Sequence, residues 1–386
     1  MRRITGLALA VVFLVWGCGE NSKNPFGLDL LQRKDTGSEK LLEIKGMTKE
    51  MTYHYQVNVG RSNKIMIGEF RGLRANLLLR FGDLSNIPHG ATVEQVLLCI
   101  WRYDDVIKAS DATPFQADIH KITQAWDDSS ITTWEEIQNG YESSSLQSIQ
   151  ITPEETNVDS FYMPTDLIQA WVDSTENNYG ILLRSAGANF IKLYYSKDSA
   201  YSPRLKVYYS TNTGTDSAEV VATEDTYLIE NTGSTPENRL IVGAGYGFAT
   251  LLHFDVNTDS LPKGTTVNRA LLTLMVDTTQ TILRKKLTFV LSSIAVKTEP
   301  EAWSPPDISL DSTSTSTSSY SEPATATIDI THLVQNWVSQ RSPNHGLRLG
   351  AFSDQTELVR LSFYASTADS TLIPKVEIFY ATPPIK

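Results

Sequence analysis

Six histidines are the side chains in this sequence best suited to metal binding or acid–base chemistry, and their spacing supports neither. They lie at positions 54, 89, 120, 253, 332 and 345. None forms an H-x-x-x-H or H-E-x-x-H pair, which would bring two imidazoles to one zinc ion. The sequence also has no G-x-S-x-G elbow, no glycine-rich phosphate loop and no Cys-x-x-Cys pair. We therefore expect no enzymatic activity and assign no catalytic or metal-binding residue.

One short segment, DVNTDS at residues 255–260, places oxygen ligands as a calcium loop would. Asp255, Asn257 and Asp259 occupy its odd positions, but the glycine at position six and the acid at position twelve are missing. We interpret this segment as a turn. No cofactor is expected, and a structural calcium ion is an option that nothing in the sequence supports.

The N-terminus has the pattern of an export signal. Arg2 and Arg3 precede an apolar run over residues 4–16, which is too short to span a membrane comfortably. The ending VWGC resembles a bacterial lipobox, which implies a signal peptide at 1–17 and a lipid on Cys18. A simple secretory signal or an uncleaved anchor are the alternatives. Cys18 is followed by GEN rather than by an aspartate, which favours the outer membrane, facing the periplasm or the cell exterior.

The charge of the chain limits its partners. With 33 basic and 44 acidic residues the net charge is −11. Nucleic-acid binding needs a positive surface that displaces counterions, so no nucleic-acid partner is expected.

The second cysteine, Cys99, lies in the apolar run VLLCIW and is predicted to be a buried small hydrophobe. The expected partners are a polysaccharide and, through the lipid on Cys18, a membrane.

Most of the chain has the pattern of short strands. Segments such as VEQVLLCIW and RLKVYYS alternate or run apolar over five to nine residues and are separated by glycine and proline turns. Such spacing is typical of an all-β sandwich or barrel. Two segments are the exception: after Thr165 and after Thr331 a short helix is predicted, with the threonine as its cap. Trp171 and Trp337 then lie on the apolar face of each helix.

The same blocks occur twice in the same order, which indicates a duplicated domain. Leu77 pairs with Leu251 at a separation of 174 residues, and Trp171 pairs with Trp337 at a separation of 166. We expect a flexible tether at 18–44, a first domain at 45–210, a linker at 211–220 and a second domain at 221–386. The serine- and threonine-rich segment 309–323 is expected to be a mobile loop.

These blocks resemble one family. The second copy carries EDTYLIE (224–230), LIVG (240–243), LLHFD (251–255) and PKGTTVNRALLTL (262–274); the first carries LLLRF (77–81), PHGATVEQVLL (88–98), ITQAWDDSSITTW (122–134) and SPRLKVYY (202–209). In this order they resemble the DNRLRE domain family, which is similar to carbohydrate-binding module family 96 and to disaggregatase-related repeats. The resemblance implies two tandem jelly-roll-type β-sandwiches that serve polysaccharide-active or surface proteins; some members bind alginate. The first copy lacks a clear DTY start, and the second keeps one tryptophan of the double-tryptophan segment.

Aromatic side chains are the candidate glycan contacts, because an aromatic ring can cover the C–H face of a sugar. Trp171, Trp337, Trp134 and Trp303 recur in both copies and are assigned to the core. The remaining candidates are Trp101 and Tyr103, at the end of a strand, and Tyr246, in the turn GAGYGF, where it is expected to be exposed.

Three hypotheses about function follow. The first is a non-catalytic lipoprotein that binds polysaccharide, with neutral glycans favoured because an acidic protein repels an acidic polymer. The second is a structural or adhesive envelope protein whose sandwiches act as spacers or docking modules. The third is a divergent glycan hydrolase, which would need two facing carboxylates.

Overall fold

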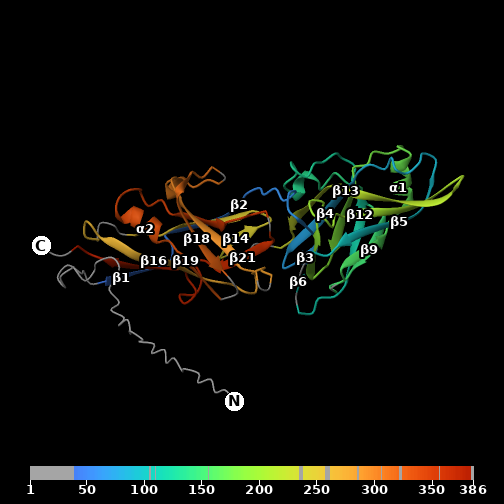
Figure 1. The fold of residues 1–386 in the computed structure, drawn as a ribbon. Coiled ribbons are helices and arrows are strands. Elements are labelled where there is room, and N and C mark those ends of the chain that lie inside the picture. The colour runs from blue at the N-terminus through green and yellow to red at the C-terminus, as the bar shows by residue number, and fades with distance from the viewer. Residues whose placement is uncertain are drawn as a thin grey trace, which may run out of the picture.

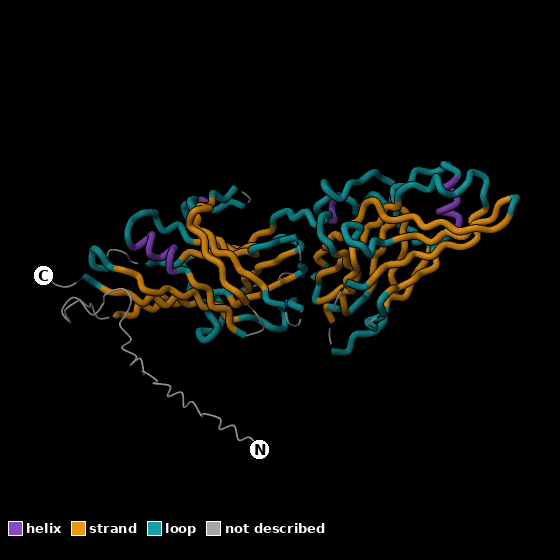
Figure 2. Tube along the Cα trace, in the orientation of Figure 1, coloured by secondary structure: helices purple, strands orange, loops and turns teal. Residues whose placement is uncertain are grey.

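The structure is a computed structural model that describes residues 39–103, 106–108, 110–154, 156–233, 238–256, 261–284, 287–305, 307–320, 324–355 and 357–383. The candidate lipid site Cys18 lies outside these residues. Two lobes lie side by side, each built from antiparallel strands with one short helix (Figures 1 and 2). The prediction of an all-β fold is therefore confirmed.

The first lobe contains eleven strands arranged around one apolar core. They are β3 (Lys64–Phe70), β4 (Leu73–Phe81), β5 (Thr92–Trp101), β6 (Ile107–Lys108), β7 (Phe115–Lys121), β8 (Gln147–Ile151), β9 (Val158–Tyr162), β10 (Ile181–Ala186), β11 (Phe190–Tyr195), β12 (Arg204–Thr211) and β13 (Gly214–Asn231). The long strand β13 pairs with β12 through its first half and with β4 through its second half, so it belongs to both layers. Between the layers, a continuous cluster of buried aliphatic and aromatic side chains forms the core.

The second lobe repeats this plan. Its strands are β1 (Glu39–Lys45), β2 (Lys49–His54), β14 (Arg239–Ala244), β15 (Phe248–His253), β16 (Thr266–Met275), β17 (Phe289–Val296), β18 (Leu310–Tyr320), β19 (Thr325–Asp329), β20 (Leu347–Ala351), β21 (Val359–Tyr364) and β22 (Lys375–Ala381). The order β1-β22-β16-β19 forms one sheet, and β18-β17-β20-β15-β14-β21 with β2 forms the other. A second apolar cluster lies between these two sheets.

The two predicted helices are present, and their tryptophans are in the cores. Helix α1 spans Thr165–Val172 and helix α2 spans Thr331–Val338. Trp171 and Trp337 are both buried, as the apolar faces of these short helices require. The predicted threonine caps are wrong, because each helix begins at the threonine itself. At α2 the Asp329 carboxylate accepts the Thr331 N–H at 2.9 Å instead.

Two predicted turns after these helices are also present, with the same geometry in both lobes. Gly180 and Gly346 have φ of +84° and +88°, a backbone conformation that side chains with a Cβ rarely adopt. Each glycine N–H donates to an asparagine two residues earlier, Asn178 or Asn344, at 3.1 Å. That asparagine also donates to a carbonyl of the neighbouring strand end, so one side chain fixes the whole turn.

The strands that open each sequence repeat are exchanged between the lobes. β1 pairs with β22 and β2 pairs with β15, so residues 39–54 complete the second lobe (the blue strands among the orange ones in Figure 1). β13, which opens the second repeat in sequence, completes the first lobe. The two exchanged strands pair in the same register: Leu228 of β13 lies opposite Asn76 of β4, and Thr52 of β2 lies opposite Thr250 of β15 at the equivalent position.

The structure corrects three expectations about loops. The linker predicted at 211–220 is a tight hairpin between β12 and β13, because the alternating residues of β13 bury Val220 and Ala222. The end of the predicted tether is strand β1. The segment expected to be a mobile loop at 309–323 contains strand β18, whose small hydroxyl side chains fit a ladder against β17; its last three residues lie outside the described chain.

Candidate functional site

One sheet of the first lobe exposes an apolar and aromatic surface. Its strands run in the order β13, β12, β5, β9, and alternate residues of each point away from the core. We call this surface the outer face. Its members are Leu97, Cys99, Trp101, Val158, Ser160, Tyr162, Arg204, Lys206, Tyr208, Glu219 and Val221. Tyr162 is 64% exposed, and Val158 and Val221 are also exposed.

The strand register sets the spacing of the three aromatic side chains on the outer face. Tyr162 lies opposite Leu97, four residues from Trp101 along β5, and Tyr208 lies opposite Gln95. With about 3.4 Å per residue and about 4.8 Å between strands, Trp101 lies about 14 Å from Tyr162 and about 20 Å from Tyr208. The aromatic side chains therefore extend over a surface longer than a single sugar ring.

Basic side chains lie between these aromatic rings. The Arg204 guanidinium lies 4.6 Å from the centre of the Trp101 indole and pairs with Glu219 at 3.0 Å. The Lys206 ammonium lies 5.2 Å from the Tyr208 ring. The contact with Arg204 holds the indole in a fixed orientation. Cys99, predicted to be buried, is partly exposed here because it points away from the core, and its sulfur lies 3.6 Å from the Ser160 hydroxyl.

The corresponding face of the second lobe differs. β16 ends in Met275 where β5 ends in Trp101, and Asp329 lies opposite Leu271 where Tyr162 lies opposite Leu97. The position of Tyr208 is occupied by Phe379. The core tryptophans Trp134 and Trp171 have counterparts in Trp303 and Trp337, whereas Trp101 and Tyr162 have none. Packing of the shared fold therefore does not explain these two side chains.

The other two predicted contacts, Tyr103 and Tyr246, do not lie on the outer face but at the junction of the lobes. Tyr103 packs against Tyr195 with ring centres 5.0 Å apart, and the Lys64 ammonium lies 4.8 Å from its ring. Tyr246 was expected to be exposed, but it is 8% exposed because its turn packs against the first lobe. The structure therefore separates Trp101 from Tyr103 and Tyr246.

A cavity of about 190 Å³ lies at this junction. Its walls come from both lobes: His54, Val57, Val59, Thr132, Thr133, Glu135, Tyr227, Ile229, Asn231, Gly245, Tyr246 and Phe248. Among the described residues, no hydrogen-bond partner reaches the hydroxyl of Tyr227 or of Tyr246. The volume is below the roughly 300–1,000 Å³ of pockets for drug-sized ligands. The cavity therefore suits a group the size of one ring rather than a polymer.

Charged and polar contacts hold the lobes together around this cavity. Lys64 of the first lobe and Arg284 of the second both pair with the Glu357 carboxylate. The Arg71 guanidinium donates to the Thr278 carbonyl at 2.8 Å, and Arg360 donates to the Arg71 carbonyl at 2.7 Å. The two lobes are thus joined by an extensive polar and apolar interface.

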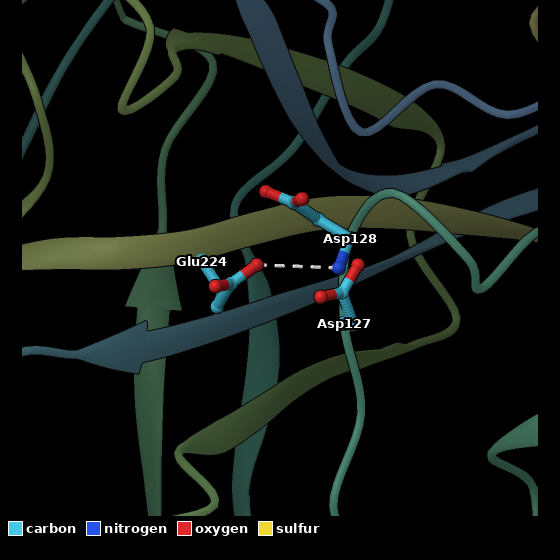
Figure 3. Close-up of side chains that lie close together, drawn as sticks. All are labelled: Asp127, Asp128 and Glu224. Carbon is cyan, nitrogen blue, oxygen red and sulfur yellow. Dashed lines mark hydrogen bonds between the residues drawn. The ribbon is translucent and has the colours of Figure 1, made fainter.

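In the described part of the chain, three acidic side chains lie close together: Asp127, Asp128 and Glu224 (Figure 3). One carboxylate oxygen of each lies within 4.8 Å of the others, and Glu224 accepts the Asp128 N–H. Two basic side chains form ion pairs with this cluster: Arg80 pairs with Glu224 at 2.9 Å, and Lys197 pairs with Asp128 at 3.0 Å. We interpret the cluster as an ion-pair network that fixes the loop around Asp128. Of the segment 255–260, which was interpreted as a turn rather than as a calcium loop, residues 257–260 lie outside the described residues.

Sequence reasoning missed Tyr162 and Tyr208. Both could have been found from alternation, because Leu205, Val207 and Tyr209 point inward and leave Lys206 and Tyr208 on the opposite face. In β9, Phe161 points into the core, so its neighbour Tyr162 must point outward. The single strands carry this signal, but only the register brings the aromatic residues together on one surface.

Comparison with protein-family models, with curated proteins and with solved structures finds no match for this chain. In the part of the chain that the structure describes, no helix is both long and apolar enough to cross a lipid bilayer.

Proposed function

We propose that this protein is a non-catalytic bacterial envelope lipoprotein that binds polysaccharide through the outer face of its first lobe. The observation that carries the proposal is the pair of the partly exposed Trp101 and the exposed Tyr162, which lie on one sheet of one lobe and are replaced by Met275 and Asp329 in the other. A flat, rigid sheet with exposed rings and flanking cations offers stacking to sugar rings and hydrogen bonds to their hydroxyls. The DNRLRE-like sequence pattern and the candidate lipid on Cys18 support the same reading.

The ligand class follows from the size and charge of the face. Its aromatic residues extend over about 20 Å, which favours a polymer over a free sugar. Arg204 is already paired with Glu219, and the whole chain carries −11. We therefore propose a neutral polysaccharide rather than an acidic one.

Two other functions compete with this proposal. A passive spacer would need no exposed aromatic residues on one lobe, so the outer face argues against a purely structural role. A glycan hydrolase needs two carboxyl groups on either side of one glycosidic bond. Among the residues that line the junction cavity, Glu135 is the single carboxylate.

The test is retention of the soluble chain, residues 19–386, on a panel of neutral and acidic polysaccharides. W101A and Y162A should each weaken binding to the retained glycan about 30-fold, since exposed aromatic anchors contribute about 2 kcal/mol. M275A changes the position of the second lobe that matches Trp101, and F379A the position that matches Tyr208; both should leave binding unchanged. Failure of every glycan to retain the folded chain, or equal losses in both pairs of variants, would overturn the proposal.

A further inference from the structure

The second lobe is completed by a separate pair of strands, residues 39–54, which we call the arm. Strand β1 forms seven residue pairs with β22, and β2 forms six with β15. Within the described chain, every hydrogen bond that leaves the arm ends on a residue of the second lobe. For example, the Thr52 hydroxyl accepts the Ile241 N–H at 3.0 Å, and Arg348 donates to the Tyr53 hydroxyl at 2.9 Å.

The arm nevertheless continues directly into the first lobe. Tyr55 still bonds to the second lobe, through its N–H to the Gly247 carbonyl and its hydroxyl to Asp354. Three residues later, Asn58 already donates to the Asp128 carbonyl of the first lobe at 2.9 Å. The chain crosses between the lobes within these few residues. The arm is thus covalently part of one lobe and structurally part of the other.

The matching strand of the first lobe is held differently. β13 follows β12 through a tight turn at 212–213, so it cannot leave its partner without unfolding the hairpin. Its Val220, Ala222, Tyr227 and Leu228 are buried. The arm has no hairpin to the second lobe, and none of its side chains is fully buried. Of the two exchanged elements, the arm is the one that can dissociate.

We propose that the edges of β22 and β15 are an exchangeable docking surface whose partner is the arm of a second copy of this chain. An arm from another molecule makes the same two ladders and the same side-chain contacts. Because the chain crosses between the lobes within residues 55–58, the first lobe attached to that arm moves with it and takes the place of the resident first lobe. Arm-exchanged molecules form dimers when two copies exchange reciprocally. In such a dimer two outer faces lie in one particle, although the proposal does not depend on what those faces bind.

Mass action sets when the exchange occurs. A short connection gives the arm of the same molecule an effective concentration of about 1 mM, so the intramolecular arrangement is favoured in dilute solution. Exchange increases as the chain concentration approaches that value, as on a crowded surface, or after transient opening of the arm. The dimer fraction should therefore rise with total protein concentration.

Two single-cysteine chains test this directly, both starting at residue 19 and carrying C99S. Glu43 of the arm lies opposite Glu377 of β22, and each carboxylate pairs with a partly exposed lysine of its own strand. Cysteines at these two positions therefore remove surface ion pairs, which contribute little to stability. E43C and E377C chains are mixed at about 10 µM to about 1 mM, opened briefly in mild urea, returned to buffer and oxidised. A disulfide between the two chains forms preferentially when the arm of one lies on the second lobe of the other, and the matched control measures disulfides that form by collision.

The matched control is the equivalent pair in the first lobe, Glu219 opposite Lys206, because the hairpin prevents exchange there. The mixture of E43C and E377C should give at least about ten times more disulfide-linked heterodimer than E219C with K206C, rising with concentration. Equal yields, or no heterodimer at the highest concentration, would overturn the proposal. If either cysteine lowers the melting temperature, the same mixing experiment is made with L41C and F379C, which also lie opposite one another, and the same two outcomes decide it.

Discussion

Asp225 should make the stability of the first lobe depend on pH near neutrality. This residue of β13 is 1% exposed, and its carboxylate accepts the Lys197 N–H at 2.5 Å. Burial, its largest influence, raises the pKa of Asp225 to about 7, and the nearby Asp198 and Asp128 act in the same direction against Lys197. The replacement of Asp225 by asparagine keeps a hydrogen-bond acceptor there but removes the titration.

The sign and size follow from linkage. In the unfolded chain an aspartate has a pKa of about 3.9, so between about pH 4 and pH 7 the folded state holds a proton that the unfolded state has lost. The free energy of unfolding therefore falls as the pH rises through this window and is constant above it. A difference of about three in pKa corresponds to about 4 kcal/mol, of which about 3 kcal/mol is lost between pH 5 and pH 8.

Urea unfolding of the wild type and D225N at pH 5 and pH 8 measures this effect. The free energy of unfolding of D225N minus that of the wild type should be about 3 kcal/mol larger at pH 8 than at pH 5. Burial lowers the pKa of His253, so this residue makes the free energy of unfolding rise with pH. The wild type and D225N share this effect, and it therefore cancels in their comparison. D216N, which changes an exposed carboxylate of the same strand, is the control. If the wild type and D225N change equally between the two pH values, the reasoning is refuted.

Three further predictions concern stability and are measured by urea unfolding at one pH. D159N removes the carboxylate that pairs at 2.6 Å with the fully buried Lys192, and it should lower the free energy of unfolding by about 3–5 kcal/mol. The double variant D159N/K192M should recover much of this loss. No recovery would contradict the pairing argument. W337A removes a buried ring that packs on Phe254 and should lower the free energy of unfolding by about 3–5 kcal/mol. W101A, on the outer face, should lower it by less than about 1 kcal/mol. Similar losses in the two variants would contradict their different placement. G346A should cost about 2–3 kcal/mol, because φ is +88° and a Cβ would lie 2.4 Å from a neighbouring carbonyl oxygen.

The fold was largely readable from the sequence because local patterns determine local structure. Alternation identified strands such as β5 and β12, and the apolar spacing around Trp171 and Trp337 identified both helices. The serine-rich segment was misread, since composition suggested a loop while its residues form β18 against β17. Its small side chains fit an edge strand, which composition alone does not reveal.

The candidate site was predictable only in part, because it depends on pairing between distant strands. Trp101 could be singled out as the last residue of a strand that leads into a polar loop. Its neighbours Tyr162 and Tyr208 come from other strands, and the register that brings them together is a long-range property. Tyr246 was misplaced for the same reason, since the packing of one lobe against the other buries its turn.

The course of the chain between the lobes has a mechanical consequence. If the N-terminus is fixed at a membrane and the first lobe is fixed to a surface polymer, tension enters at β1 and leaves through the crossing after His54. The force then acts on the ladders of β1 with β22 and of β2 with β15, and the remainder of the second lobe lies outside the stretched path. Detachment of the arm would release about 50 Å of extended chain while the first lobe stays folded. Under such a load the arm of the second lobe would detach before the first lobe unfolds.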